Sequence, residues 1–134
     1  RNIIALIIIN LIGKTSKVQL INFGGHIMGD RVTVSFKDNN GKESVSIYHH
    51  WGGKAFPALV RHWYKDHYKQ PEFQGIYASK VVVQFLGWLG KHNKLSDSID
   101  IYKDKNDIDA DDNGHYTIFT KDGRMTNGSG EYIE

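Results

Sequence analysis

The stretch Arg-Val-Thr-Val-Ser-Phe-Lys at residues 31–37 decides the fold, because apolar and polar side chains alternate strictly along it. Such alternation is typical of a β-strand with one buried face, here the face of the two valines and the phenylalanine. Asp-Asn-Asn-Gly at residues 38–41 favours a turn, and the alternation resumes through Val45 and Ile47. The segment therefore predicts an antiparallel β-hairpin.

The chain after this hairpin changes to helical spacing. Apolar side chains within residues 56–67 recur every three or four positions, which predicts an amphipathic helix. A second stripe of this kind, within residues 82–89, predicts another helix.

Two further β-rich segments follow, at residues 99–102 and 115–121. In the first, Ile99 and Ile101 share the expected core face, and Tyr102 lies on the opposite face. The order strand, strand, helix, helix, strand, strand predicts an α+β fold, with an antiparallel sheet and two helices packed on one face. The other face is expected to be open to solvent or to a partner subunit.

The N-terminal segment differs from this body. Residues 3–12 are almost wholly apolar, but the run is about half the length that a membrane helix needs. We expect residues 1–27 to be an N-terminal extension, either an accessory hairpin or a segment that precedes a natural start at Met28. Residues 28–134 are then expected to form a single ligand-binding domain that does not interact with a membrane.

Composition restricts the classes of function. The 134 residues contain no cysteine, and the net charge is only +2. These values exclude a disulfide framework and a thiolate metal site, suit the reducing cytoplasm, and give no clustered basic surface for nucleic acid. We expect a cytoplasmic protein with no cofactor and no nucleic-acid partner.

The corner between the second strand and the first helix, residues 48–54, is the first candidate ligand site. Glycine N–H groups at a helix start attract phosphate or carboxylate, and a lysine adds positive charge. The alternative is that the tryptophan fills the core and the glycines only make the turn. The candidate ligand-binding residues here are Trp51, Gly52, Gly53 and Lys54.

Histidines raise a catalytic alternative. His49 and His50 are adjacent on a strand and point to opposite faces, so the pair does not form a metal site. Histidine is the side chain that most often serves as a general base, but no nucleophile or carboxylate can be paired with His50 from the sequence. A small nucleotide-cleaving enzyme that uses His50 therefore stays an alternative, and a non-enzymatic protein is preferred.

The aspartate-rich loop at residues 107–114 resembles the opening of a calcium-binding EF-hand loop. The match fails at the twelfth position, where Thr120 replaces the required glutamate, and no metal site is expected. A structural or calcium-binding interaction protein remains a second alternative, and an ordinary solvated turn is the simpler interpretation.

Tyr102 is a candidate stacking platform because strand alternation directs it away from the core. An outward aromatic ring can stack on a nucleobase, although ordinary exposed strand tyrosines are as common.

Three segments together resemble a known family: residues 28–36 (Met-Gly-Asp-Arg-Val-Thr-Val-Ser-Phe), 48–53 (Tyr-His-His-Trp-Gly-Gly) and 112–116 (Asp-Asn-Gly-His-Tyr). They are similar to the first class of anti-Thoeris sponge proteins of phages and prophages. The resemblance implies a non-catalytic homo-oligomer in the host cytoplasm. Its implied partner is a small anionic nucleotide of the cyclic ADP-ribose type, which the protein sequesters to block a bacterial defence.

The resemblance also implies particular site residues. Tyr102 would stack on the adenine and Asn113 would hydrogen-bond the ligand, with Trp51 and Arg124 as further contacts. The chain departs from the family in the residues before Met28 and in its aspartate-rich loop, whose negative charge opposes an anionic ligand.

Overall fold

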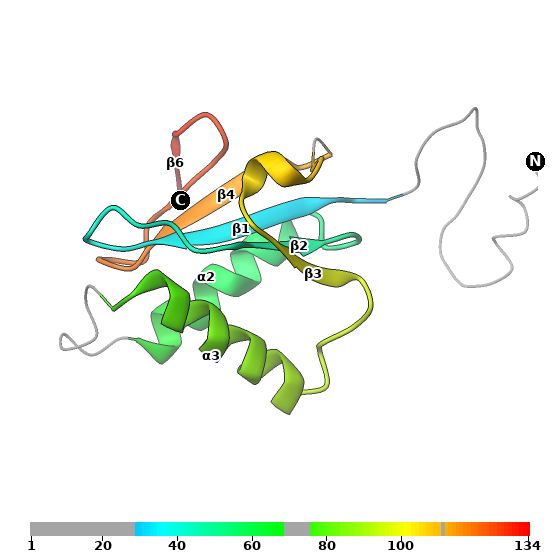
Figure 1. The fold of residues 1–134 in the computed structure, drawn as a ribbon, viewed down its shortest axis with the longest axis horizontal. Helices are drawn as coiled ribbons and strands as arrows, with labels where there is room; N and C mark the ends of the chain where they lie inside the picture. Colours follow the sequence, from blue (N-terminus) through cyan, green and yellow to red (C-terminus); the bar gives the residue numbers. More distant parts are fainter. Residues whose placement is uncertain (1–28, 69–75, 111) are drawn as a thin grey trace, which may run out of the picture.

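The computed structural model describes residues 29–68, 76–110 and 112–134. It confirms the α+β class: two helices pack on one face of a sheet (Figure 1). The expected extension, residues 1–27, lies outside the described residues. In chain order, the elements are β1 (Val32–Lys37), β2 (Ser46–His49), α2 (Ala55–His67), α3 (Ala78–Lys91), β3 (Ile99–Tyr102), the 3-10 helix η2 (Lys105–Asp107), β4 (His115–Phe119), β5 (Met125–Thr126) and β6 (Tyr132–Ile133).

The six strands lie in the order β3-β2-β1-β4-β5-β6. The neighbouring pairs are antiparallel except β1 and β4, which run parallel. This one pair departs from the predicted antiparallel sheet. The long connection through both helices and β3 allows β4 to return beside β1 in the same direction, as parallel strands require.

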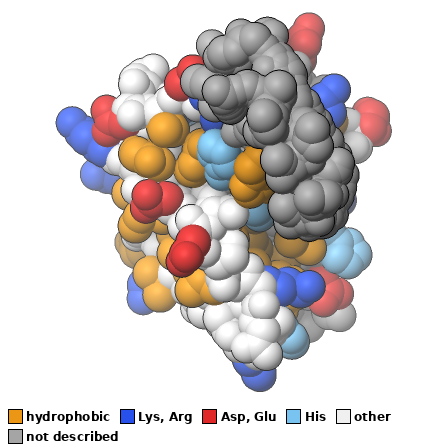
Figure 2. Space-filling model, turned by 90° about the vertical axis from the view of Figure 1, so that its right-hand side faces the viewer, with side chains coloured by type: hydrophobic (Ala, Val, Ile, Leu, Met, Phe, Trp, Pro, Cys, Tyr) orange, Lys and Arg blue, Asp and Glu red, His pale blue; other side chains and the backbone are white. Residues whose placement is uncertain are grey.

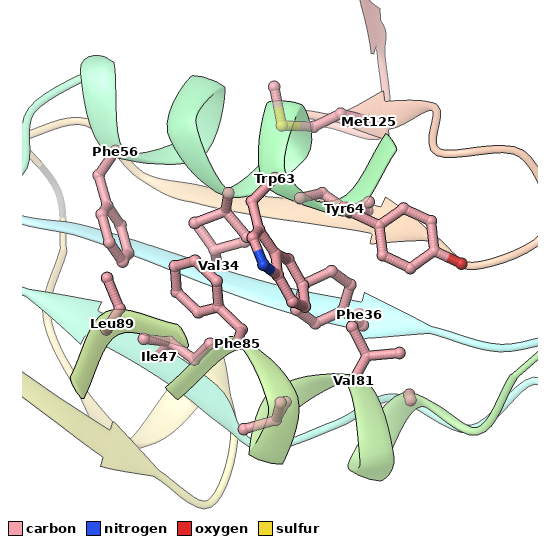
Figure 3. Close-up of a cluster of buried hydrophobic side chains, with 14 of the residues drawn as sticks. Val34, Phe36, Ile47, Phe56, Trp63, Tyr64, Val81, Phe85, Leu89 and Met125 are labelled. Carbon is pink, nitrogen blue, oxygen red and sulfur yellow. The ribbon is translucent and has the colours of Figure 1, made fainter. Parts of the chain in front are cut away.

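The predicted core face of β1 is confirmed, although the other face of the strand is buried as well. Its valines and Phe36 are fully buried on the helical side, where the two helices cover the sheet. α2 contributes Trp63 and α3 contributes Phe85, and their rings lie 5.1 Å apart (Figure 3). The helical stripes predicted from the sequence therefore form the core.

The edge strand β3 corrects one expectation. Ile101 pairs with the buried Ile47, so it lies on the helical side of the sheet as predicted. Ile101 is nevertheless 49% exposed, and Ile99 is only half-buried. Ile101 is therefore not a core residue, because the helices cover the centre of the sheet more completely than this edge.

The face opposite the helices is not open, which corrects a second expectation. Thr33, Ser35 and Thr117 lie on that face and are less than a tenth exposed. Figure 1 shows the segment with η2 and the turn between β5 and β6 on this side of the sheet. These connections give the face a polar interior layer.

Neither α-helix in the described part of the chain combines the length and the apolar character needed to cross a membrane.

Candidate ligand-binding site

The corner between β2 and α2 is built on two glycines. Gly53 has a φ of +58°, and its N–H donates to the Asp30 carbonyl at 2.9 Å. A Cβ at Gly53 would lie 2.5 Å from Asp30 Oδ2, so only glycine fits this close approach. The Asp30 carboxylate lies beside the start of the helix, where a ligand phosphate would meet like charge. The helix start is thus a poor phosphate site despite its glycines.

An aromatic row leads away from this corner. It consists of Tyr102, Tyr48, His50 and Trp51, which come from β3, β2 and the following turn. Each ring meets the next edge-to-face, with centroid distances of 5.7, 6.1 and 4.8 Å in that order. Tyr48 Oη also lies 2.7 Å from His50 Nδ1. The rings of Tyr48 and His50 thus connect two of the predicted ligand residues, Trp51 and Tyr102.

The outer end of the row is accessible. Trp51 is 54% exposed, so it does not fill the core. Figure 2 looks at the molecule from the side on which β2 turns toward α2, and hydrophobic and histidine side chains adjoin one another there. This surface offers flat apolar area of the kind that a nucleobase covers.

The inner end of the row contains an unpaired hydroxyl. Tyr102 pairs with Ser46 across the sheet, which places both side chains on the face opposite the helices, as predicted for Tyr102. Tyr102 is half-buried, and Ser46 is almost fully buried. Ser46 Oγ has no hydrogen-bond partner among the described residues. A buried hydroxyl without a partner is a local cost to the fold, and its burial keeps it out of reach of a ligand.

Asn113 lies where the chain enters β4, and its amide is already engaged. Its Nδ2 donates to Asp30 Oδ1 at 2.6 Å and to the Arg31 carbonyl at 3.1 Å. No described residue donates to its Oδ1, which is left as an acceptor. Asn113 thus holds the start of β1 and keeps one polar atom for a ligand.

Arg31 changes the electrostatics of the aspartate-rich loop. Its guanidinium donates to Asp112 Oδ2 at 2.9 Å and to Asp109 Oδ2 at 3.3 Å. The hydrogen bonds from Arg31 hold the pKa of Asp112 below its usual range. One arginine therefore offsets part of the negative charge of the aspartate-rich loop.

Two of the predicted site residues, Arg124 and Lys54, lie away from the aromatic row. Asn113 precedes β4 and Arg124 follows it, so the length of the strand, about 16 Å, separates them. Arg124 pairs with Asp122 at 2.8 Å and lies 4.2 Å from the centroid of the Tyr132 ring. Lys54 is exposed and lines a groove along α2. The structure therefore connects Trp51 with Tyr102, and brings neither Arg124 nor Lys54 into the row.

A second polar cluster was missed by sequence reasoning. His115 Nδ1 lies 2.8 Å from Thr33 Oγ1, and its Nε2 lies 3.2 Å from Glu43 Oε2 and 3.1 Å from Ser35 Oγ. Ser35 Oγ also donates to Glu43. The hydrogen bond from His115 is the main cause of a Glu43 pKa lowered to about 2. These groups belong to three segments of the chain, and no local pattern indicates that they meet.

This cluster has the residue types of a hydrolytic triad, but a substrate cannot reach its hydroxyl groups. Ser35 and Thr33 are almost completely buried, whereas a nucleophile must reach a substrate carbonyl or phosphorus atom. His115 also directs the same nitrogen to both Ser35 and Glu43, unlike a base that lies between nucleophile and acid. We interpret the cluster as a structural polar core.

The aspartate-rich loop gives a prediction about calcium. Two of its carboxylates bind Arg31, Asp111 lies outside the described residues, and the described residues contain no group of three metal-ligating acids or histidines. We expect EDTA to leave the melting temperature of the protein unchanged, as measured by circular dichroism. A fall of several degrees that calcium reverses would instead support a calcium-dependent interaction protein.

Comparison with known proteins gave no match: no family model matches the chain, and no curated protein or solved structure is significantly similar to it.

Proposed function

We propose that this chain is a non-catalytic binding protein that sequesters a small cyclic nucleotide of the cyclic ADP-ribose type. By removing this signal from the host cytoplasm, it blocks a bacterial anti-phage defence. The protein acts as a homo-oligomer, as the family resemblance implies.

The observation that carries this proposal is the aromatic row that runs from the half-buried Tyr102 to the exposed Trp51. The row offers ring faces for stacking, and the phenol of Tyr102 and the indole N–H of Trp51 offer hydrogen bonds at its two ends. An adenine has a flat face and polar edges, so both interactions suit it. Asn113 Oδ1 adds an acceptor at the same end of the sheet as His50 and Trp51.

Arg31 reduces the negative charge that an anionic ligand would meet near the row. Arg31 offsets Asp109 and Asp112, which would otherwise repel phosphate. The row includes one group with the chemistry of a general base, His50, whose Nδ1 is hydrogen-bonded to the Tyr48 phenol. This bond fixes the orientation of the imidazole ring within the row.

The experiment substitutes Tyr102→Ala and Asn113→Ala and measures the binding of cyclic ADP-ribose by calorimetric titration. Loss of stacking or of one buried hydrogen bond costs about 1 to 3 kcal/mol. Each dissociation constant should therefore rise by about one to two orders of magnitude. Tyr132→Ala is the matched control, because it removes an exposed tyrosine from the far edge of the sheet.

Two results would contradict the proposal. One is unchanged binding by both folded variants, and the other is an absence of cyclic ADP-ribose binding by the wild type. Mass spectrometry of the supernatant after heat denaturation distinguishes a sequestering protein from a nucleotide-cleaving enzyme. The first releases intact ligand, and the second releases cleaved ligand.

A further inference from the structure

A groove runs between α2 and the β4–β6 side of the sheet, with a volume of about 590 Å³. One wall is basic and contains Lys54, Arg61, His62 and Lys65. The other wall is mainly apolar, and Tyr116 and Met125 contribute to it. The groove lies on the helical side of the sheet, away from Tyr102, and the inference drawn from it does not depend on the proposed function.

The basic wall follows directly from helical spacing. Lys54, Arg61 and Lys65 are separated by seven and then four residues, which places them on one face of α2. At a rise of 1.5 Å per residue, the stripe extends over about 16 Å. A compact ligand with one or two phosphate groups fits this length.

Arg61 is held in position by the turn between β4 and β5 and by β6, and the stem of Lys65 lies against the same turn. Arg61 donates from Nε to the Gly123 carbonyl at 3.1 Å and from Nη1 to the Ile133 carbonyl at 3.2 Å. A guanidinium has five N–H donors, so the remaining ones stay available. The Lys65 stem lies against Gly123, where a Cβ would come within 2.8 Å of Lys65 Cγ. A guanidinium fixed in this way, as in Arg61, loses less entropy when it binds an anion.

The cations form no ion pair with the described residues. In the described part of the chain, no carboxylate lies within ion-pair distance of Lys54, Arg61 or Lys65. Glu134 is the acidic residue that lines the groove. Three cations therefore face one acidic side chain along the groove, which leaves a net positive charge, as expected of an anion-binding surface.

We propose that this groove is a second ligand site, which binds a small phosphorylated organic molecule of the nucleotide type. Arg61 and the two lysines take the phosphates, because guanidinium and ammonium groups form charge-assisted hydrogen bonds with phosphate oxygens. The half-buried Tyr116 and the buried Met125 face the organic part. A net charge of +2 and the shortness of the stripe disfavour a long nucleic acid.

The test is calorimetric titration of the full chain with ADP, inorganic pyrophosphate and adenosine. We expect ADP to bind more tightly than pyrophosphate and adenosine. The double variant Lys54→Gln/Lys65→Gln should weaken ADP binding by about a hundredfold, since each charged contact contributes about tenfold. The control Lys80→Gln/Lys91→Gln removes the same charge from exposed positions of α3 and should change binding by less than about threefold.

Tyr102→Ala separates the two sites and should leave ADP binding unchanged. Loss of ADP binding in Tyr102→Ala, with full binding in Lys54→Gln/Lys65→Gln, would place ADP on the aromatic row and overturn the inference. Three other results would also overturn the inference. They are the absence of both ADP and pyrophosphate binding, equal losses of ADP affinity in the two double lysine variants, and tighter binding of a single-stranded oligothymidylate than of ADP. Circular dichroism melting of each variant verifies that it is folded.

Discussion

Phe85→Ala is expected to lower the free energy of unfolding by about 3 to 5 kcal/mol, the range for a large aromatic side chain removed from a packed core. Phe85 is fully buried in α3. Its ring lies 5.1 Å from that of Trp63 and 6.1 Å from that of Phe56. The substitution removes one ring from the layer that joins both helices to the sheet (Figure 3).

Urea denaturation followed by tryptophan fluorescence measures this loss. Val83→Ala is the matched control, because Val83 belongs to the same helix and is 70% exposed. Its effect should stay within about 0.5 kcal/mol. Equal losses for the two variants would show that α3 packs on the sheet through a different face.

Much of the fold was predictable because its signals are local. The alternation in β1 and the three-to-four spacing in α2 each lie within a single strand or helix. They can therefore be recognised in the sequence without knowledge of the rest of the fold. β5 and β6 contain two residues each, too few to show a period. The parallel pairing of β1 with β4 was also missed, because pairing between distant strands depends on the path of the chain through the helices.

The candidate site shows the same limit. Strand alternation correctly placed Tyr102 on the face opposite the helices, and the sequence also indicated Trp51 at the corner. It did not show that Tyr48 and His50 connect them, because this requires the register of β2 against β3. Asn113 and Arg124 are eleven residues apart in the chain, but an extended strand separates them at the two ends of the sheet. Side-chain chemistry is readable from sequence, whereas proximity between segments is not.

His115→Ala is expected to lower the free energy of unfolding by about 2 to 4 kcal/mol, because it removes the centre of a buried polar cluster. Thr33 Oγ1 would lose its hydrogen-bond partner at His115 Nδ1, and Glu43 would lose the partner at Nε2. Thr33 is only 1% exposed, so water cannot readily replace the missing group. Urea denaturation at neutral pH measures the loss, and an effect below about 0.5 kcal/mol would show that the cluster contributes nothing to stability.

Glu43→Gln tests the charge in this cluster, because it keeps the shape of the side chain. Folding lowers the pKa of Glu43 from 4.5 to about 2, chiefly through the hydrogen bond from His115. A carboxyl group whose pKa is lower in the folded state stabilises the protein fully above the unfolded value, and this contribution disappears as the pH falls toward the folded value. The stability difference between wild type and Glu43→Gln should therefore be complete above about pH 4.5 and shrink as the pH falls toward 2. A difference that did not shrink over this range would mean that shape and hydrogen-bond geometry, rather than the charge of Glu43, hold β1 and β4 together at His115.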